Sequence, residues 1–302
     1  SENNLLLEKI NHTNFSKNFI NENMLPVMKI SSSLKNKNLI GYIPDCQHLH
    51  LETFFLKRVI IYRNYQIRRI KKFCKKVYCT SENVKKDLTK HYNFLPENVY
   101  VTGFIPMRLE PNVKKLEIVD EEYFLIANQL WQHKNHSYAI EAFYDFLEKN
   151  NNKEIKLFCT GYIHDHRDET YSSSIFELIN KLNLSDNVKF LGYLERREFI
   201  KYLISCKALI QPTLFEGSPG GFSVADAVAY GVPVLLSDIP INKEVDAGEV
   251  SYFDLSNKKY LTKLLEDSYV ISQNNRYEKS EAISKQASIK LGQVIKELIT
   301  QK

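Results

Sequence analysis

Residues 209–238 read LIQPTLFEGSPGGFSVADAVAYGVPVLLSD, and they carry the clearest evidence for the fold. An apolar run ends in a glycine-rich polar loop, and a short apolar helix is expected over 223–230. Gly231 and Pro233 suit the end of that helix, and a second apolar strand, 234–236, completes the unit. A strand, a glycine-rich loop and a helix N-terminus together form an anion site, because the first N–H groups of a helix have no partner within it.

The simplest ligand for this loop is a nucleotide diphosphate that carries a polar group. Asp226 lies inside an apolar helix, where an unpaired acid would be costly. A ribose diol is favoured as its partner over an internal ion pair, as for the acidic residue of dinucleotide folds. Glycine lets the backbone approach a ligand closely. We therefore assign phosphate contacts to four residues, Gly220, Gly221, Phe222 and Ser223.

These residues resemble the nucleotide-sugar site of family 4 glycosyltransferases (glycosyl transferases group 1), which are retaining enzymes of the GT-B fold. The usual pattern there is two glutamates separated by seven residues, the second lying five residues before a Gly-x-Pro. Glu216 fits the first position and Asp226 the second, so the second acid is shorter and the loop two residues longer. The resemblance implies that Glu216 orients sugar hydroxyls and that Asp226 holds the ribose. A helix cap or a lysine partner is the alternative role for Glu216.

A second motif, FLIANQLWQHKNHSYAIEAF, covers residues 124–143 and predicts a buried strand, a loop and an amphipathic helix. In the resembled family this loop carries an Arg and a Lys that hold the donor pyrophosphate. Lys134 matches the Lys, Gln129 stands at the position of the Arg, and Asn128 precedes it as a further donor contact. A lysine is a strong point-charge partner for phosphates, whereas glutamine offers only neutral hydrogen bonds. Trp131 is expected to pack rather than to stack on a base.

Strands alternating with helices predict an α/β fold of parallel sheets. The resemblance makes it GT-B-like, with two Rossmann-type domains facing a cleft. A carboxy-terminal nucleotide-sugar domain is expected over 113–279, followed by a helix in 280–302 that crosses back to the first domain. The expected strands of this second domain are 124–128, 155–160, 188–192, 208–212 and 234–237.

The expected first domain, residues 1–112 on the acceptor side, is shorter than usual for the resembled fold. Its only predicted core strands are 39–44, 77–80 and 99–102, and residues 1–38 lack a recognisable early strand. Either an amino-terminal part has been removed or the acceptor domain is reduced.

One segment of this half, GYIPDCQHLHLETFF at 41–55, leaves a strand and enters a polar loop. It resembles a cleft-facing segment of relatives, so Asp45 and His48 are candidate catalytic residues that would bind sugar hydroxyls or the leaving phosphate. A structural hydrogen bond is the alternative for His48. A metal held by His48 and His50 is disfavoured because no third ligand has a convincing spacing. With no DxD motif, we expect a metal-independent enzyme. The polar cluster at 164–168 is expected to be a solvated loop.

The amino-acid composition limits which classes of protein remain possible. A chain of 302 residues suffices for two domains. Its five cysteines are scattered without a CxxC, which disfavours a disulfide framework or zinc site. No apolar run is as long as a membrane span, and no signal peptide is visible. We expect a cytoplasmic protein, and an alternative is a peripheral one at the inner face of the membrane.

Charge is unevenly distributed along the chain. Residues 1–112 hold 18 basic against 9 acidic residues, and the remainder holds 23 against 27. Most of the excess lies in residues 54–78, which predict a basic amphipathic helix. A solvated outer face and contact with anionic lipid headgroups are both open. Nucleic-acid binding is disfavoured because no nucleic-acid-binding signature accompanies the charge.

The function that the resemblance implies is sugar transfer from a UDP- or GDP-linked donor to a glycan or lipid-linked acceptor, with retained anomeric configuration, in surface polysaccharide or glycoconjugate synthesis. No further cofactor is expected. Lys134 and the amides of 220–223 would stabilise charge on the departing phosphate, and that phosphate would assist deprotonation of the acceptor. The alternatives are a nucleotide-sugar epimerase or hydrolase, and a non-catalytic subunit that binds a partner transferase.

Overall fold

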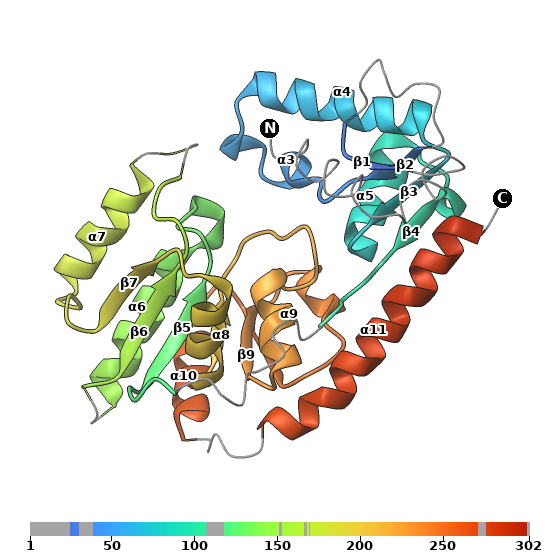
Figure 1. Ribbon diagram of the computed structural model, residues 1–302. Coiled ribbons are helices and arrows are strands. Elements are labelled where there is room, and N and C mark those ends of the chain that lie inside the picture. Colours follow the sequence, from blue (N-terminus) through green and yellow to red (C-terminus); the bar gives the residue numbers. More distant parts are fainter. Residues whose placement is uncertain are drawn as a thin grey trace.

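Two β-sheets flanked by helices organise the chain (Figure 1). The computed structural model describes residues 25–29, 39–106, 118–150, 153–165, 168, 170–270 and 276–300. Every strand pair within these ranges is parallel, as expected when helices cross between successive strands. The predicted α/β fold is confirmed.

The first sheet has the order β1-β2-β3-β4 in the part of the chain that the structure describes. Its strands are β1 Leu25–Val27, β2 Leu39–Tyr42, β3 Lys76–Cys79 and β4 Val99–Val101. The helices here are α3 Gln47–His50, α4 Lys57–Phe73 and α5 Glu82–Tyr92, with short 3-10 turns at Glu52–Phe54 and Pro96–Asn98. Ser81 caps α5 by accepting a hydrogen bond from the Val84 N–H, and Asn93 ends it in the left-handed conformation.

The second sheet has the order β10-β9-β8-β5-β6-β7. Its strands are β5 Tyr123–Ala127, β6 Lys156–Thr160, β7 Val188–Gly192, β8 Leu209–Gln211, β9 Val234–Ser237 and β10 Val250–Phe253. The helices are α6 His136–Lys149, α7 Tyr171–Lys181, α8 Arg196–Ser205, α9 Phe222–Ala229 and α10 Lys259–Tyr269, with 3-10 turns η5 Gln132–Lys134 and η6 Asn242–Glu244. This is the doubly wound strand order, whose ligands bind where the order reverses.

The central strand β5 is buried on both faces and divides the core in two. Phe124 and Ile126 pack into one cluster with residues of α6 and α10, and Tyr123 and Leu125 pack into another with residues of α8 and α9. Side chains alternate between the faces of a strand, so a sheet covered by helices on both sides produces this continuous apolar run.

The predicted strands match the observed ones to within two residues, and two strands were missed. The expectation that residues 1–38 hold no strand is wrong, because β1 pairs with β2. It has only three residues, one of them proline, in a polar stretch. β10 was also missed, because in this edge strand only Phe253 is buried and the other three residues are exposed or half-buried, so the strand has no continuous apolar run. The basic helix is α4, shorter than the predicted range 54–78, whose end belongs to β3.

The last helix, α11 Arg276–Thr300, begins four residues before the predicted start at 280. It contacts α9 of the second sheet region and β4 of the first, and it runs from one to the other in Figure 1. Lys76 of β3 donates a hydrogen bond to the Leu298 carbonyl at 2.9 Å. The predicted domain boundary at 112–113 lies outside the described residues. None of the helices in the described ranges is both long and apolar enough to cross a bilayer.

Candidate functional site

The candidate site lies where the strand order of the second sheet reverses, between β5 and β8. The chain leaves β5 through Asn128 and Gln129, and it leaves β8 after Gln211. The Asn128 side-chain amide donates a hydrogen bond to Gln211 Oε1 across this point. A cavity of about 450 Å³ opens here, and residues of both sheet regions line it.

An ion pair between Lys134 and Glu216 forms part of the wall of this cavity. Lys134 Nζ lies 2.5 Å from Glu216 Oε1, and both side chains are largely buried. Gln211, which is 1% exposed, donates its Nε2–H groups to the same Glu216 oxygen and to the Gly220 carbonyl, each at 2.9 Å. Two motifs about eighty residues apart therefore meet, and Gln211 holds the carboxylate in place.

The glycine-rich loop brings the start of α9 to the same cavity. Gly221 has φ 79°, and a Cβ there would lie 3.3 Å from Gln211 Nε2 and Glu216 Oε2, so a side chain would be both strained and crowded. It precedes α9 without any side-chain cap, so the first N–H groups of the helix remain available to an anion. Gly221, Phe222 and Ser223 line the cavity, whereas Gly220 contributes its carbonyl to Gln211.

A larger cavity of about 810 Å³ adjoins the first one and shares Asp45 and Trp131 with it. Phe54 and Phe55, just before α4, and Arg58 in its first turn line this cavity, and so does Asp165 of the second sheet region. Asp45 accepts a hydrogen bond from the Gln47 N–H at 2.8 Å and pairs with Arg63. The Asp45 carboxylate thus lies at the junction of two cavities that residues of both sheet regions line.

A third cavity of about 290 Å³ continues from Asn128 and Gln129 along the ends of β6 and β7. Tyr162 and Tyr193 stack there, with ring centroids 5.2 Å apart and an interplanar angle of 17°. Both residues are more than half exposed, and Arg196 lines the same cavity. Exposed stacked aromatic rings next to a cation form a surface on which a planar base could stack.

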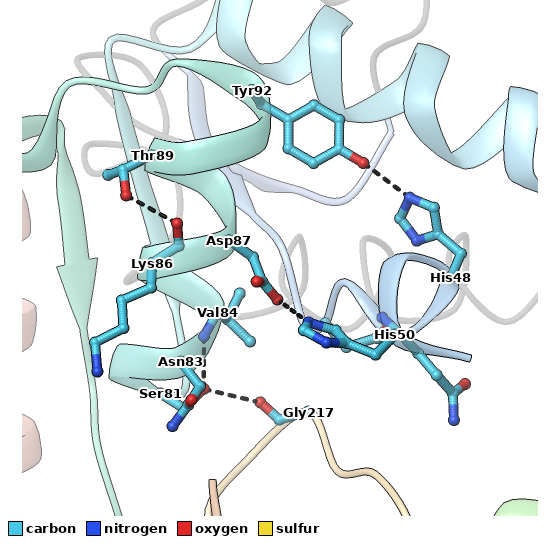
Figure 2. A network of polar contacts seen from close by, with 12 residues as sticks. His48, His50, Ser81, Asn83, Val84, Lys86, Asp87, Thr89, Tyr92 and Gly217 are labelled. Atoms are coloured by element: carbon cyan, nitrogen blue, oxygen red, sulfur yellow. Dashed lines mark hydrogen bonds and ion pairs between the residues drawn. The ribbon is translucent and has the colours of Figure 1, made fainter. Parts of the chain in front are cut away.

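The prediction that His48 faces the substrate is contradicted by its position. His48 is 2% exposed and lines none of these cavities. Figure 2 shows its ring directed at Tyr92 of α5, with Nε2 2.8 Å from the hydroxyl. Because Tyr92 donates to Asn64 at 2.7 Å and Arg63 Nε–H donates to His48 Nδ1 at 3.1 Å, the ring carries its proton on Nε2.

His48 therefore acts on Arg63, which in turn pairs with Asp45 at the cavity junction. Burial, reinforced by the Arg63 charge, lowers the pKa of His48 to about 4, which keeps the ring neutral and able to accept from Arg63. Burial also lowers the pKa of His136, close to Lys134, to about 3. His48 is a positioning residue, and the side chain it positions, Asp45, is the one that reaches the cavity.

Asp226 forms the internal ion pair that the sequence analysis disfavoured, so the preference for ribose as its direct partner is corrected. Arg196 of α8 donates to both Asp226 oxygens, at 2.5 and 2.6 Å. This bidentate hydrogen bonding raises the pKa of Arg196. Asp226 lines none of the three cavities, whereas Arg196 lines the third. The carboxylate thus holds a cation at the cavity that continues from Gln129.

The lining residues that were not predicted from the sequence include Tyr42, Thr80, Gln211 and Arg196, and also the stacked pair Tyr162 and Tyr193. A polar Gln at the end of a buried strand was a usable signal for Gln211. Thr80 donates its hydroxyl proton to the Gly217 carbonyl at 2.7 Å, a contact between distant segments that no local pattern reveals. Within the described ranges, no three His, Cys, Asp or Glu side chains are grouped as metal ligands.

Comparisons with known proteins find one matching family and similar proteins. The family model described as glycosyl transferases group 1 matches residues 107–287. The O-antigen chain mannosyltransferase RfbU of Salmonella typhimurium (strain LT2) is 26% identical over 227 residues, which cover 75% of this chain and 59% of that protein. A glycosyltransferase of Methanocaldococcus jannaschii is 23% identical over 257 residues, which cover 80% of this chain and 59% of that protein. The chain thus spans about three fifths of the length of these curated relatives.

Solved structures resemble the chain at lower identity. Anabaena HepE in complex with UDP and glucose has a TM-score of 0.69 at 16% identity, with 89% of this chain and 73% of that chain covered. WaaG, a glycosyltransferase involved in lipopolysaccharide biosynthesis, has a TM-score of 0.67 at 17% identity, with 96% and 85% covered. The chain therefore has the fold of GT-B glycosyltransferases.

Proposed function

The chain belongs to the glycosyl transferases group 1 family, and from this premise we propose that it is a retaining glycosyltransferase. It would move a sugar from a UDP- or GDP-linked donor to a glycan or lipid-linked acceptor without a metal. The observation that carries the proposal is the buried Lys134–Glu216 pair beside the uncapped start of α9, at the reversal point of the second sheet.

The donor would lie across two cavities. Its base fits against Tyr162 and Tyr193, its pyrophosphate between Lys134 and the first amides of α9, and its sugar against Glu216. Positive charge at the pyrophosphate favours bond cleavage, because negative charge develops on the leaving phosphate oxygen. Gln129, at the family's arginine position, would contribute only a neutral hydrogen bond.

The acceptor would enter the cavity of about 810 Å³, so that its hydroxyl meets the sugar near Asp45. The bond between the anomeric carbon and the phosphate oxygen breaks, and a bond from that carbon to the acceptor oxygen forms on the same face. The acceptor proton passes to the leaving phosphate oxygen. Asp45, fixed by Arg63, would orient the acceptor hydroxyl. Asp226 would act on the nucleoside indirectly, by holding Arg196 in position beside it.

The wider role that we propose is synthesis of a surface polysaccharide or glycoconjugate. It is supported by the names of two similar proteins, an O-antigen chain mannosyltransferase and a transferase of lipopolysaccharide biosynthesis. Neither name identifies the sugar that this chain transfers.

A donor-turnover assay tests the proposal. The protein is incubated with UDP- and GDP-sugars, with and without candidate acceptors, and release of nucleoside diphosphate is measured. We expect acceptor-dependent release for one donor and a loss of about 10²- to 10³-fold in Glu216→Gln, as when one transition-state contact is removed. Equal turnover in Glu216→Gln would contradict the site. Net epimerisation of the donor would contradict transfer.

A further inference from the structure

The outer face of α4 is strongly basic and carries exposed apolar side chains. The helix has seven Lys or Arg and no Asp or Glu in its 17 residues. In Figure 1 it lies along the outer side of the first sheet region. Its solvent-facing stripe follows helical spacing and consists of Lys57, Arg58, Ile61, Tyr62, Tyr65, Arg68, Lys71 and Lys72.

The positive charge of this stripe is not neutralised by described acidic residues. Of the α4 cations, only Arg63, on the inner side, forms an ion pair with a described acid. An adjoining segment adds Lys29, whose Nζ lies 5.9 Å from the centroid of Tyr62. A solvated surface helix would be expected to balance such charge with acids three or four residues away. The stripe instead presents a net positive surface to solvent.

Apolar exposure on the same stripe indicates what kind of partner fits. Ile61 is 69% exposed, and Leu56, just before the helix, is 62% exposed. Tyr62 and Tyr65 are about half exposed and lie among the cations. Basic residues bind anionic headgroups, while aliphatic and aromatic side chains enter the boundary between headgroups and acyl chains. Nucleic acid would satisfy the charge but offers no apolar layer for Ile61 and Leu56.

We propose that this stripe is a docking surface for an anionic lipid membrane. The helix would lie in the membrane plane, with Ile61 and the two tyrosines at headgroup depth and the cations among the lipid phosphates. Each basic residue near such a surface contributes about 1 kcal/mol, or about fivefold in partitioning. This surface lies outside the donor site and does not depend on Lys134 or Glu216.

The docking surface also leads to the acceptor side of the cleft. Leu56, Arg58 and Val59, at the start of α4, line the cavity of about 810 Å³. A membrane bound along α4 would therefore lie next to the mouth of that cavity. On the basis of the proposed function, the acceptor is then a membrane-embedded, lipid-linked molecule that enters the cavity from the bilayer.

Vesicle flotation tests the docking surface. The probes are vesicles of phosphatidylcholine alone and vesicles with about one third phosphatidylglycerol, and partitioning is measured at low and high salt. Wild-type protein is expected to float only with the anionic vesicles, less at high salt. The triple variant Arg68→Ala/Lys71→Ala/Lys72→Ala, remote from the cavities, is expected to lose about 100-fold in partitioning.

A matched control removes the same charge elsewhere. Lys181, Lys259 and Lys285 are exposed and form no ion pair with described residues, so their triple alanine variant should float like wild type. Ile61→Ser should weaken binding at high salt, where insertion matters most. Equal loss in the control, or full flotation of the α4 variant, would overturn the proposal.

Two further measurements separate the alternatives. Binding of single-stranded RNA that requires the same three cations, without vesicle binding, would replace the membrane by nucleic acid. Donor binding, measured by calorimetry on the α4 variant, should be unchanged. If wild-type protein floats but binds no donor, the docking surface stands and the proposed function fails.

Discussion

Lys134 and Glu216 form a buried pair whose roles in stability and turnover can be separated. Lys134→Met leaves the Glu216 carboxylate, in a residue that is 8% exposed, without its cation. Removing one partner of a buried pair costs about 3–5 kcal/mol. We expect the free energy of unfolding, measured in urea, to fall by about that amount and to recover largely in Lys134→Met/Glu216→Gln.

Turnover should not recover in that double variant, because no cation would face the phosphates. Lys181→Met, at an exposed position, is the control for a loss of charge alone. It should change neither the free energy of unfolding nor turnover. A double variant that regains turnover would show that the pair is structural only.

Neutral His48 predicts a pH dependence of stability. Its pKa is about 4 in the folded protein, whereas the ordinary value is 6.5. As the pH falls below 6.5, the unfolded chain therefore binds a proton at His48 that the folded protein does not bind. Stability is therefore lost between about pH 6.5 and 4, by about 2 kcal/mol on going from about pH 7.5 to about pH 5. Urea unfolding of wild type and His48→Gln at both pH values should show a smaller loss in the variant. Equal losses would contradict the buried, neutral ring.

The sequence predicts the residues of the site better than it predicts their contacts. Lys134 and Glu216 were predicted and do meet, because each follows a buried strand and parallel strands end at one edge. His48 and Asp226 were placed wrongly. Their partners, Tyr92 and Arg196, are 44 and 30 residues away, and no periodicity encodes those contacts.

Among the elements, the loop between β8 and α9 contacts the first sheet region at Gly217. A Cβ on this residue would lie 2.6 Å from the Pro44 carbonyl oxygen and 2.9 Å from Asp45 Cβ. Gly217→Ala should therefore push the Glu216 loop away from Asp45 and lower kcat/KM by about tenfold or more, since small misplacements of reacting groups are costly.

Gly292→Ala provides the matched control for that substitution. Gly292 lies in α11, and a Cβ added there would have no neighbouring atom within 4 Å. Alanine should therefore stabilise the helix by about 0.5–1 kcal/mol. Thermal unfolding measures the stability of both variants, and steady-state kinetics measure their kcat/KM. Wild-type kinetics in Gly217→Ala would show that the close contact has no part in transfer.

Strands were predictable where the apolar run is continuous and failed where it is not. All the central strands of the second sheet were found, because helices cover both of their faces. β10, at the sheet edge, and β1, with three residues, lack that signal.

In the whole molecule, Glu244 of η6 joins the two sheet regions by capping α5. Its carboxylate accepts hydrogen bonds from the Glu82 and Asn83 N–H groups, both at 2.8 Å. Glu244→Ala should expose these amides and speed their hydrogen exchange by about fivefold, consistent with a cap worth about 1 kcal/mol. Asp246→Ala, which removes an exposed pair with Lys290, is the control and should leave that exchange unchanged. Unchanged exchange in Glu244→Ala would contradict the cap.

Calorimetric titration with UDP- and GDP-sugars measures whether a nucleotide-sugar donor binds between Lys134 and α9, as we propose. We expect micromolar binding of one donor to the wild type and to Lys181→Ala, and a loss of at least tenfold in affinity in Lys134→Ala. No binding of any donor to the wild type, or equal affinity in Lys134→Ala, would contradict the proposal.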